Sequence, residues 1–467
     1  MRRARSIAGA LARRRIELFL AFVYLAICGV LDFIRLPHID IDSHSYVNLA
    51  RGFLACGEFI SQDEHGTVLR SFVRTPGYPM FLVPFMGSLG AKGLPGVIWI
   101  QRLLWAWLIA FILPSCGAPG TRAARSFAVL GKCIALLLPA ALVTTSMVLS
   151  ETVYTVVTVA AIGLLCARTA MWSAIVAGSV LGAATLIRPV GLWVPVLVCA
   201  TLALFHSRDF PMARKARLRN LAAMLTVAMM LPLLWMLRVQ NLTGNFALTS
   251  LNDPTFALNR HHVIKQFTPD QIAQLASDQQ QFVRYVHDDK DVYWALELLR
   301  RDLKYDEFTA SRLAGNVAWA AVRLDPMDYV KTVGLNLTRT FCSATEGLSL
   351  IARCAGNPGL TTETFAQSWE KHRTAMIIAQ LLLRVLQPVL LLGLPLFILL
   401  RYRRRILGDN FLCALLISSG YLVFVPSLLT ITYGRFLFPA LPAIASVYAL
   451  PLLVQRGVWH CSNKPER

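Results

Sequence analysis

The residues best suited to chemistry lie between Asp40 and Pro79, in the segment that follows the first apolar stretch of the chain. This segment opens with Asp40-Ile-Asp-Ser-His-Ser-Tyr46 and ends with Arg74-Thr-Pro-Gly-Tyr-Pro79. A carboxylate at a bilayer surface can accept a proton from a hydroxyl or an amine. An arginine binds phosphate through its forked guanidinium, and a stiff proline-bearing turn would hold it in place. The pattern predicts chemistry on a lipid-linked substrate at a membrane surface.

Other charged residues lie at the predicted outer ends of apolar stretches. Arg188 and Arg435 are placed where the positive-inside bias disfavours cations. Binding of a phosphate would explain them, as would snorkelling or pairing with an acid. Glu151 follows Ser150 at a junction of two predicted spans, where a carboxylate is either functional or part of a helix cap. Both interpretations stay open for these residues.

Two further features of the same regions leave alternatives open. His44 lies beside Asp40 and Asp42, a combination that admits a divalent metal, so a metal is left open and no cofactor is firmly predicted. Arg102 lies inside a predicted span, where it would pair within the bundle or help to bind a headgroup. Tyr78 has the simpler interpretation of an interfacial or packed ring.

The composition is that of a membrane protein. The chain has 467 residues, of which 56% are hydrophobic and only 15% charged, and its mean hydropathy is +0.54. A soluble domain carries about 25% charged residues. The net charge of +20 resides mainly in short segments beside the apolar stretches, which is typical of the positive-inside rule rather than of nucleic-acid binding. We therefore predict an all-α polytopic membrane protein without a nucleic-acid partner.

Apolar stretches of about 20 residues span the hydrocarbon core. Ten such spans are predicted, which would cross the inner (plasma) membrane of the cell. Both termini would lie in the cytoplasm. They are 16–36, 94–114, 126–148, 151–170, 172–187, 190–206, 219–239, 375–400, 408–430 and 436–455. The resulting parts are a basic cytoplasmic N-terminus (1–15), an N-terminal transmembrane module (16–240) with an outer loop (37–93), an extracytoplasmic helical subdomain (241–374), a C-terminal transmembrane module (375–455) and a cytoplasmic tail (456–467).

The segment 241–374 has a different composition, with 14 Lys and Arg against 15 Asp and Glu. Thr268-Pro269 begins a predicted helix through a capping hydroxyl and a proline in the first turn, and Asp325-Pro326 begins another. Cys342 and Cys354 lie in this segment, and a disulfide between them is left open. In the outer loop, 46–56 and 78–89 are predicted to be helices that lie in the membrane interface.

The order of these motifs resembles the GT-C fold, the membrane-embedded glycosyltransferases that use polyprenyl-phosphate sugars. This group includes protein O-mannosyltransferases and the aminoarabinose transferases of bacterial lipid A. The most specific match is an acid four residues before a tyrosine, then a helix, a glycine and a proline-bearing turn. The matching residues are Asp42, Tyr46, Ala50, Leu54, Gly57, the turn 74–79, Gln101-Arg102-Leu103, Ser150-Glu151, Arg188-Pro189, Asp325-Pro326, Tyr329, Arg435-Phe436, Pro439 and Pro442.

The resemblance implies a function for each candidate residue. Asp42 would be the general base of an inverting sugar transfer outside the membrane. The donor would be a polyprenyl-phosphate monosaccharide, and the acceptor a protein, lipid or glycan. The donor phosphate would be bound by Arg74, Arg435 and Arg188. The supporting or acceptor site would be formed by Asp40, His44, Tyr46, Tyr78, Glu151 and Arg102.

One departure from the family concerns the turn. The aminoarabinose transferases have a Glu-Lys-Pro-like turn where this chain has Arg74-Thr75-Pro76, so an acid that helps to hold a metal is replaced by a cation. Two rival functions remain, a transporter or lipid flippase for glycan precursors and a non-catalytic glycan-assembly subunit. Transporters commonly show internal repeats and broken helices at mid-membrane, and the sequence shows neither.

Overall fold

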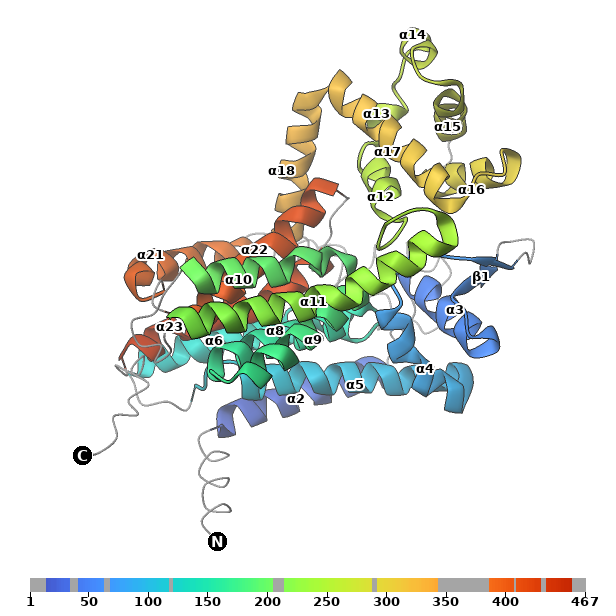
Figure 1. Ribbon diagram of the computed structural model, residues 1–467. Helices are drawn as coiled ribbons and strands as arrows, with labels where there is room; N and C mark the ends of the chain where they lie inside the picture. Colours follow the sequence, from blue (N-terminus) through green and yellow to red (C-terminus); the bar gives the residue numbers. More distant parts are fainter. Residues whose placement is uncertain are drawn as a thin grey trace.

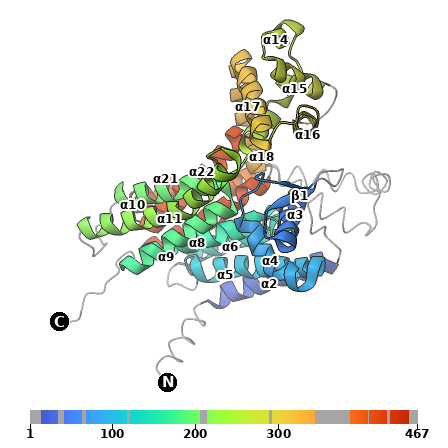
Figure 2. The same ribbon diagram turned by 45° about the vertical axis from the view of Figure 1, so that its right-hand side comes forward.

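The computed structural model describes residues 14–33, 41–62, 68–116, 121–204, 214–287, 292–342, 386–406, 409–429 and 434–455. In these ranges the regular structure is helical apart from one two-stranded hairpin. Long helices run side by side in a bundle, and a smaller group of helices stands on one end of it (Figures 1 and 2). The protein is an all-α polytopic membrane protein with a helical segment outside the bundle.

Ten apolar segments form the bundle at the predicted places, and seven of those in the described ranges are long and apolar enough to cross a membrane. They are α2 (Arg15–Phe33), α5 (Leu94–Trp107) with the π-helix η2 (Leu108–Ile112), α8 (Ser150–Ala167), α11 (Arg214–Thr243), η4 (Val389–Gly393) with α21 (Leu394–Ile406), α22 (Asn410–Leu429), and η5 (Gly434–Ala440) with α23 (Leu441–Gln455). The pair α6 (Arg122–Leu137) and α7 (Pro139–Thr145) makes an eighth. Two shorter segments are α9 (Met171–Ile187), and η3 (Pro189–Trp193) with α10 (Val194–Leu204).

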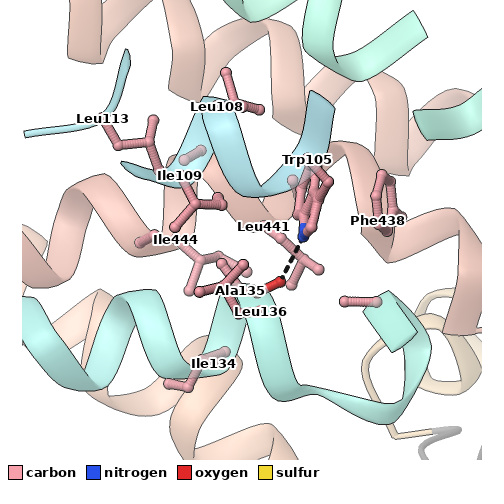
Figure 3. Close-up of a cluster of buried hydrophobic side chains, with 14 of the residues drawn as sticks. Trp105, Leu108, Ile109, Leu113, Ile134, Ala135, Leu136, Phe438, Leu441 and Ile444 are labelled. Atoms are coloured by element: carbon pink, nitrogen blue, oxygen red, sulfur yellow. Dashed lines mark hydrogen bonds between the residues drawn. The ribbon is translucent and has the colours of Figure 1, made fainter. Parts of the chain in front are cut away.

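The span predicted over 126–148 is not one straight helix, because α6 and α7 meet at an angle of 45°. Pro139 begins α7 and has no N–H with which to bond the carbonyl four residues earlier. That carbonyl belongs to Ala135, and the indole Nε1 of Trp105 donates to it at 3.1 Å (Figure 3). The bend therefore exposes a backbone acceptor, and the neighbouring helix α5 supplies the donor.

Two helices are longer than the spans predicted over them. The helix that contains the predicted span 219–239 begins at Arg214 and continues to Thr243, so part of the basic run before the span is helical. The helix expected to end at residue 400 extends to Ile406, and its predicted first residues, 375–385, lie outside the described ranges. In both cases cationic side chains continue the helix, because Arg and Lys are good helix formers.

Helices α9 and α11 pack closely through two glycines. Gly178 and Gly182 are four residues apart on one face of α9, and a Cβ on either would lie within 2.7 Å of the backbone oxygen of Met224 or Ala228 in α11. Small residues at this spacing let two membrane helices bring their backbones together. The two helices run side by side in both views (Figures 1 and 2).

The outer loop contains two helices and a hairpin. α3 (Ile41–Cys56) ends at Gly57, whose φ of 71° suits a glycine. The antiparallel strands β1 (Ile60–Gln62) and β2 (Val68–Arg70) follow. The chain then enters α4 (Gly77–Leu89) and the short η1 (Gly90–Gly93). Both helices predicted in this loop are present, and their placement in the membrane interface stays a prediction. The hairpin was not predicted.

The group of helices outside the bundle has its own apolar core. It comprises α12 (Asn252–Asn259), α13 (His261–Ile264), α14 (Pro269–Ala273), α15 (Ser277–His287), α16 (Val292–Asp302), α17 (Glu307–Leu324) and α18 (Pro326–Cys342). Thr268 caps α14 as predicted, through a complete capping box with Gln271. The helix predicted to start at Pro326 runs beyond Tyr329 to Cys342. Here we call these helices the subdomain.

The subdomain is fastened to the end of α22. Asn259 Nδ2 and Tyr329 Oη donate to the carbonyl oxygen of Leu428, at 3.1 and 3.2 Å, and Asn336 Nδ2 donates to that of Ser427 at 3.3 Å. The last carbonyls of a helix have no partner within the helix, so these bonds satisfy groups that would otherwise be left open. The contacts hold the subdomain on one end of the bundle.

Basic residues gather at the opposite end. The start of α2 meets α6 there, where Lys132 Nζ lies 3.5 Å from the carboxylate of Glu17. Described basic residues at this end include Arg122, Arg125, Arg168, Arg217, Arg219, Arg401 and Arg403. This separation is what the positive-inside rule requires if the basic end faces the cytoplasm. The assignment of this end to the cytoplasm stays a prediction.

Candidate active site

The loop and α3 bring Asp42 and Arg74 into direct contact. Arg74 Nη2 donates to Asp42 Oδ1 at 2.6 Å, and the two side chains are 16% and 29% exposed. Asp42 lies in the first turn of α3, and Arg74 lies in a bend of the chain just before α4. A charge-assisted hydrogen bond of this length is among the stronger polar contacts in proteins.

Arg74 is surrounded by further oxygen atoms and an aromatic ring. Its guanidinium carbon lies 5.0 Å from the ring centre of Tyr46, a favourable position for a cation. Burial opposes the charge, but the nearby oxygens of Tyr46, Asp42 and Tyr293 raise the pKa of Arg74 above its ordinary value. Its Nε is buried and has no hydrogen-bond partner among the residues that the structure describes. Arg74 is therefore a stable cation with one donor still to be satisfied.

Two tyrosines connect this pair to the bundle. The hydroxyl of Tyr46 lies 3.0 Å from Ser150 Oγ at the start of α8. The ring of Tyr46 packs edge-on against that of Tyr78, with centroids 4.8 Å apart. Tyr78 Oη donates to Gln101 Oε1 at 2.7 Å, and Gln101 Nε2 donates to the carbonyl of Met147 at 2.8 Å. The loop is thus held against α5 and the start of α8.

A second ion pair lies beside the first, at the same end of the bundle. Arg188 Nη1 lies 2.7 Å from Glu151 Oε1, and these side chains are 15% and 5% exposed. Glu151 is in the first turn of α8, and Arg188 directly follows α9. A Cβ on Gly77 would come within 2.6 Å of the α9 backbone at Leu186 and Ile187. The turn that follows Arg74 therefore rests on the end of α9 next to Arg188.

The subdomain fixes the residues that precede Arg74. The N–H of Phe72 donates to Glu307 Oε1 at 3.1 Å, and Ser250 Oγ also donates to this carboxylate. Thr249 Oγ1 donates to the carbonyl of Val73 at 2.6 Å. Burial raises the pKa of Glu307, and the hydrogen bond from Ser250 partly offsets this. The position of Arg74 consequently depends on the subdomain as well as on the bundle.

Several site residues predicted from the sequence come together, and one does not. Asp42, Arg74, Tyr46 and Tyr78 form one contact network. Arg102 is fully buried, and it donates to both carboxylate oxygens of Asp32 at 2.6 and 2.7 Å. For Arg102 the alternative of pairing within the bundle is therefore the one observed.

Asp32, Ser250 and Glu307 were not singled out in the sequence. An acid within an apolar stretch is costly and is usually paired or functional, and Asp32 lies in the last turn of α2. That signal could have marked Asp32. No comparable signal marks Ser250 or Glu307, because their importance comes from the backbone that they contact.

The remaining candidates from the sequence either have another contact than expected or lie outside the described residues. Ser150 does not cap α8, since Leu149 occupies the cap position and the Ser150 hydroxyl contacts Tyr46 instead. Asp40, Cys354 and the side chains of Arg435 and Cys342 lie outside what the structure describes. His44 is exposed.

A metal site would need several His, Cys, Asp or Glu side chains close together. No group of three His, Cys, Asp or Glu side chains lies close enough there to hold a metal ion. Asp42 Oδ1 forms an ion pair with Arg74. We derive no step through a metal.

Comparisons with known proteins give limited information. No family model matches the chain, and no curated protein matches it. Among solved structures, the crystal structure of ArnT from Cupriavidus metallidurans bound to undecaprenyl phosphate is 15% identical, with a TM-score of 0.39. The apo structure of the same protein is 14% identical, with a TM-score of 0.37. Each alignment covers 93% of this chain and 77% of that one.

The arrangement combines two chemical capacities at one end of the bundle. Asp42 supplies a carboxylate that can accept a proton. Arg74 supplies a cation with an unsatisfied donor, and Arg188 lies close to the turn that carries it. Such cations stabilise the charge that develops on a departing phosphate. A proton acceptor next to two cations suits the transfer of a group from a phosphate to a hydroxyl.

Proposed function

We propose that the protein is a membrane glycosyltransferase that moves a monosaccharide from a polyprenyl-phosphate donor to an acceptor hydroxyl outside the cytoplasm. The observation that carries the proposal is the Asp42–Arg74 pair, set at 2.6 Å where the subdomain meets the bundle. The isoprenoid tail of the donor would lie against the apolar helices of the bundle. The sequence motifs that resemble GT-C enzymes centre on the same two residues.

In the proposed reaction, Asp42 accepts the proton of the acceptor hydroxyl while the oxygen attacks the anomeric carbon of the sugar. The bond between that carbon and the phosphate oxygen breaks, and the electron pair leaves with the polyprenyl phosphate. Attack opposite to the leaving group inverts the anomeric configuration. The phosphate is a good leaving group, so it needs stabilisation by cations more than it needs an acid.

The ion pair has to open for this reaction to occur. A donor phosphate would take over the Arg74 guanidinium, including the Nε that has no partner among the described residues. Asp42 Oδ1 would then be released to the acceptor hydroxyl. Arg188 and Arg435 would add positive charge to the phosphate site, and Tyr46 and Tyr78 would hold the loop during the exchange.

The test is transfer by the purified protein with Asp42→Asn. This variant keeps a polar side chain of the same shape but removes the proton acceptor, and general base catalysis contributes about 10²- to 10⁴-fold. The matched control is Glu58→Gln, which neutralises an exposed acid in the same loop. The proposal requires transfer to fall by at least about 100-fold in Asp42→Asn and to persist in Glu58→Gln.

Three further results would contradict the proposal. If Asp42→Asn turned over at the wild-type rate, Asp42 would not be the general base. Absence of transfer with solute counterflow in proteoliposomes would favour the transporter or flippase. Normal glycan assembly in cells that carry Asp42→Asn would favour the non-catalytic subunit.

A further inference from the structure

An open pocket lies at the basic end of the bundle, far along the helices from the candidate active site. It lies where the end of α8, the starts of α9, α11 and α22 and the end of α10 meet. α11 begins at this end and finishes beside the subdomain (Figure 1). None of the residues assigned to the candidate active site lines this pocket.

The rim of the pocket carries two arginines. Arg168 follows α8 and is exposed, whereas Arg217, in the first turns of α11, is only 7% exposed. Both side chains line the pocket. Asn220 Nδ2 donates to the carbonyl of Thr169 at 2.8 Å, which ties α11 to the turn after Arg168. The two cations are therefore held on neighbouring, mutually fixed elements.

A polar side chain with unsatisfied bonding capacity faces the same space. Asn410, the first residue of α22, lines the pocket and is 8% exposed. Its Oδ1 is buried and has no hydrogen-bond partner among the residues that the structure describes. A buried carboxamide oxygen without a partner is unfavourable, and a ligand that bonds to it would relieve that cost. A carboxamide can turn to offer either its oxygen or its NH₂ group to a ligand.

The neighbouring acid, Asp409, bonds to the start of α22. Asp409 is buried beside Asn410, and its Oδ1 accepts from the N–H of Leu412 at 2.9 Å at the start of α22. This carboxylate therefore caps a helix, where the positive end of the helix dipole also stabilises it. Arg168 and Arg217 are the charged side chains among the described residues that line the pocket.

The inner wall of the pocket is apolar. It is formed by Leu165, Ala174, Leu202 and Leu221, on four different helices. An inorganic anion would leave this wall in contact with water, whereas the chain of a lipid would cover it. Basic pockets between membrane helices on the cytoplasmic side are suited to phosphate-bearing lipid headgroups.

We propose that this pocket binds the phosphate headgroup of an anionic lipid from the leaflet at the basic end of the bundle. Arg168 and Arg217 contact the phosphate oxygens, Asn410 completes the contact, and the first part of the lipid chain lies on the apolar wall. The site is separate from sugar transfer, so it stands whether or not the proposed function is correct. A bound lipid would hold α8, α9, α11 and α22 together.

The test measures thermal stability of the full-length protein in neutral detergent. The added probes are phosphatidylglycerol, phosphatidylcholine and inorganic phosphate, each over the same concentration range. A ligand that binds only the folded state raises the Tm, so phosphatidylglycerol is expected to raise it by several degrees and phosphatidylcholine is not. Native mass spectrometry of the wild type, with retention of phosphatidylglycerol over phosphatidylcholine, provides a second measurement that needs no variant.

Variants of the pocket residues test whether phosphatidylglycerol raises the Tm by binding in this pocket. Arg217→Gln and Asn410→Ala are each expected to reduce the shift caused by phosphatidylglycerol by at least half. The control is Arg122→Gln, which removes an exposed cation at the same end, on α6, outside the pocket. An unchanged shift in both pocket variants, or an equal loss in the control, would overturn the site.

The inorganic phosphate arm identifies the source of the ligand. A shift as large as that with phosphatidylglycerol, and lost in the same variants, would show that a soluble phosphate occupies the pocket and would overturn the lipid. No shift with either anion, together with no lipid retained in native mass spectrometry, would overturn the proposal altogether.

Discussion

Asp42 and Arg74, which are 32 residues apart in the sequence, form an ion pair of 2.6 Å at the junction of the subdomain and the bundle. The Arg74 guanidinium bonds to the Asp42 oxygen that would accept the proton. In the same way, Asp42 bonds to the guanidinium that would bind the phosphate. A donor phosphate can take over Arg74 while the hydroxyl of a separate acceptor takes over Asp42. The pair therefore keeps both charges compensated until a suitable substrate arrives.

The first prediction concerns the cation of this pair. Arg74→Gln is expected to lower kcat/KM for the donor about 100-fold, because about 2–3 kcal/mol of charge-assisted hydrogen bonds to phosphate is lost. Arg70→Gln is the control in the same loop, since it removes only the exposed pair with Glu58, and exposed pairs contribute about 1 kcal/mol or less. Equal activity of the two variants in a donor titration would refute phosphate binding by Arg74.

The second prediction concerns the contact between Tyr46 and Ser150. Tyr46→Phe keeps the ring under Arg74 but removes the hydroxyl that lies 3.0 Å from Ser150 Oγ. Tyr46→Phe and Ser150→Ala are each expected to destabilise the protein by about 1 kcal/mol. Residues in contact are not independent, so the double variant should lose less than the two single losses added. Additive losses in a thermal-stability double-mutant cycle would show that the contact contributes nothing.

A third prediction concerns the close approach of Gly77 to α9. In Gly77→Ala the new Cβ would come within 2.6 Å of backbone atoms of Leu186 and Ile187, and a helix backbone cannot give way as a side chain can. The loop must shift, so transfer and Tm should both fall. Gly96→Ala is the control, because its Cβ would meet only a ring carbon of Phe85 at 3.9 Å. Equal Tm values for the two variants would contradict the packing.

The fourth prediction is a pH dependence at Glu307. Burial raises the pKa of this carboxyl in the folded state above its value in the unfolded chain. Between the unfolded pKa of about 4.3 and the higher folded pKa, the folded state binds more protons than the unfolded state. The stability that Glu307 contributes is therefore fully present below the unfolded pKa. It is lost as pH rises through the folded pKa.

Glu307→Gln removes this titration while keeping an oxygen that can accept from Phe72 and Ser250. Relative to the wild type, the variant should gain in Tm as pH rises through that window. The measurement is the difference in Tm between the two proteins from pH 4 upward, which cancels the titration of all other groups. A difference that is constant with pH would show that burial does not perturb Glu307.

Much of the fold was predictable because local composition decides it. Ten apolar stretches form helices at the expected places, since backbone groups in hydrocarbon must be satisfied within one segment. The helix starts at Pro269 and Pro326 followed from capping and proline rules. The bend at Pro139 was not predicted, although proline in an apolar stretch was a visible signal for it.

The sequence by itself determined the membrane class, the approximate spans and the candidate residues of the outer loop, because hydropathy, charge bias and turn residues act over short distances. Only the tertiary structure decided which charges meet. Arg74 pairs with Asp42, Arg188 with Glu151 and Arg102 with Asp32. Each of these pairs joins separate elements, so it depends on how helices pack against one another, which neither residue of the pair encodes locally.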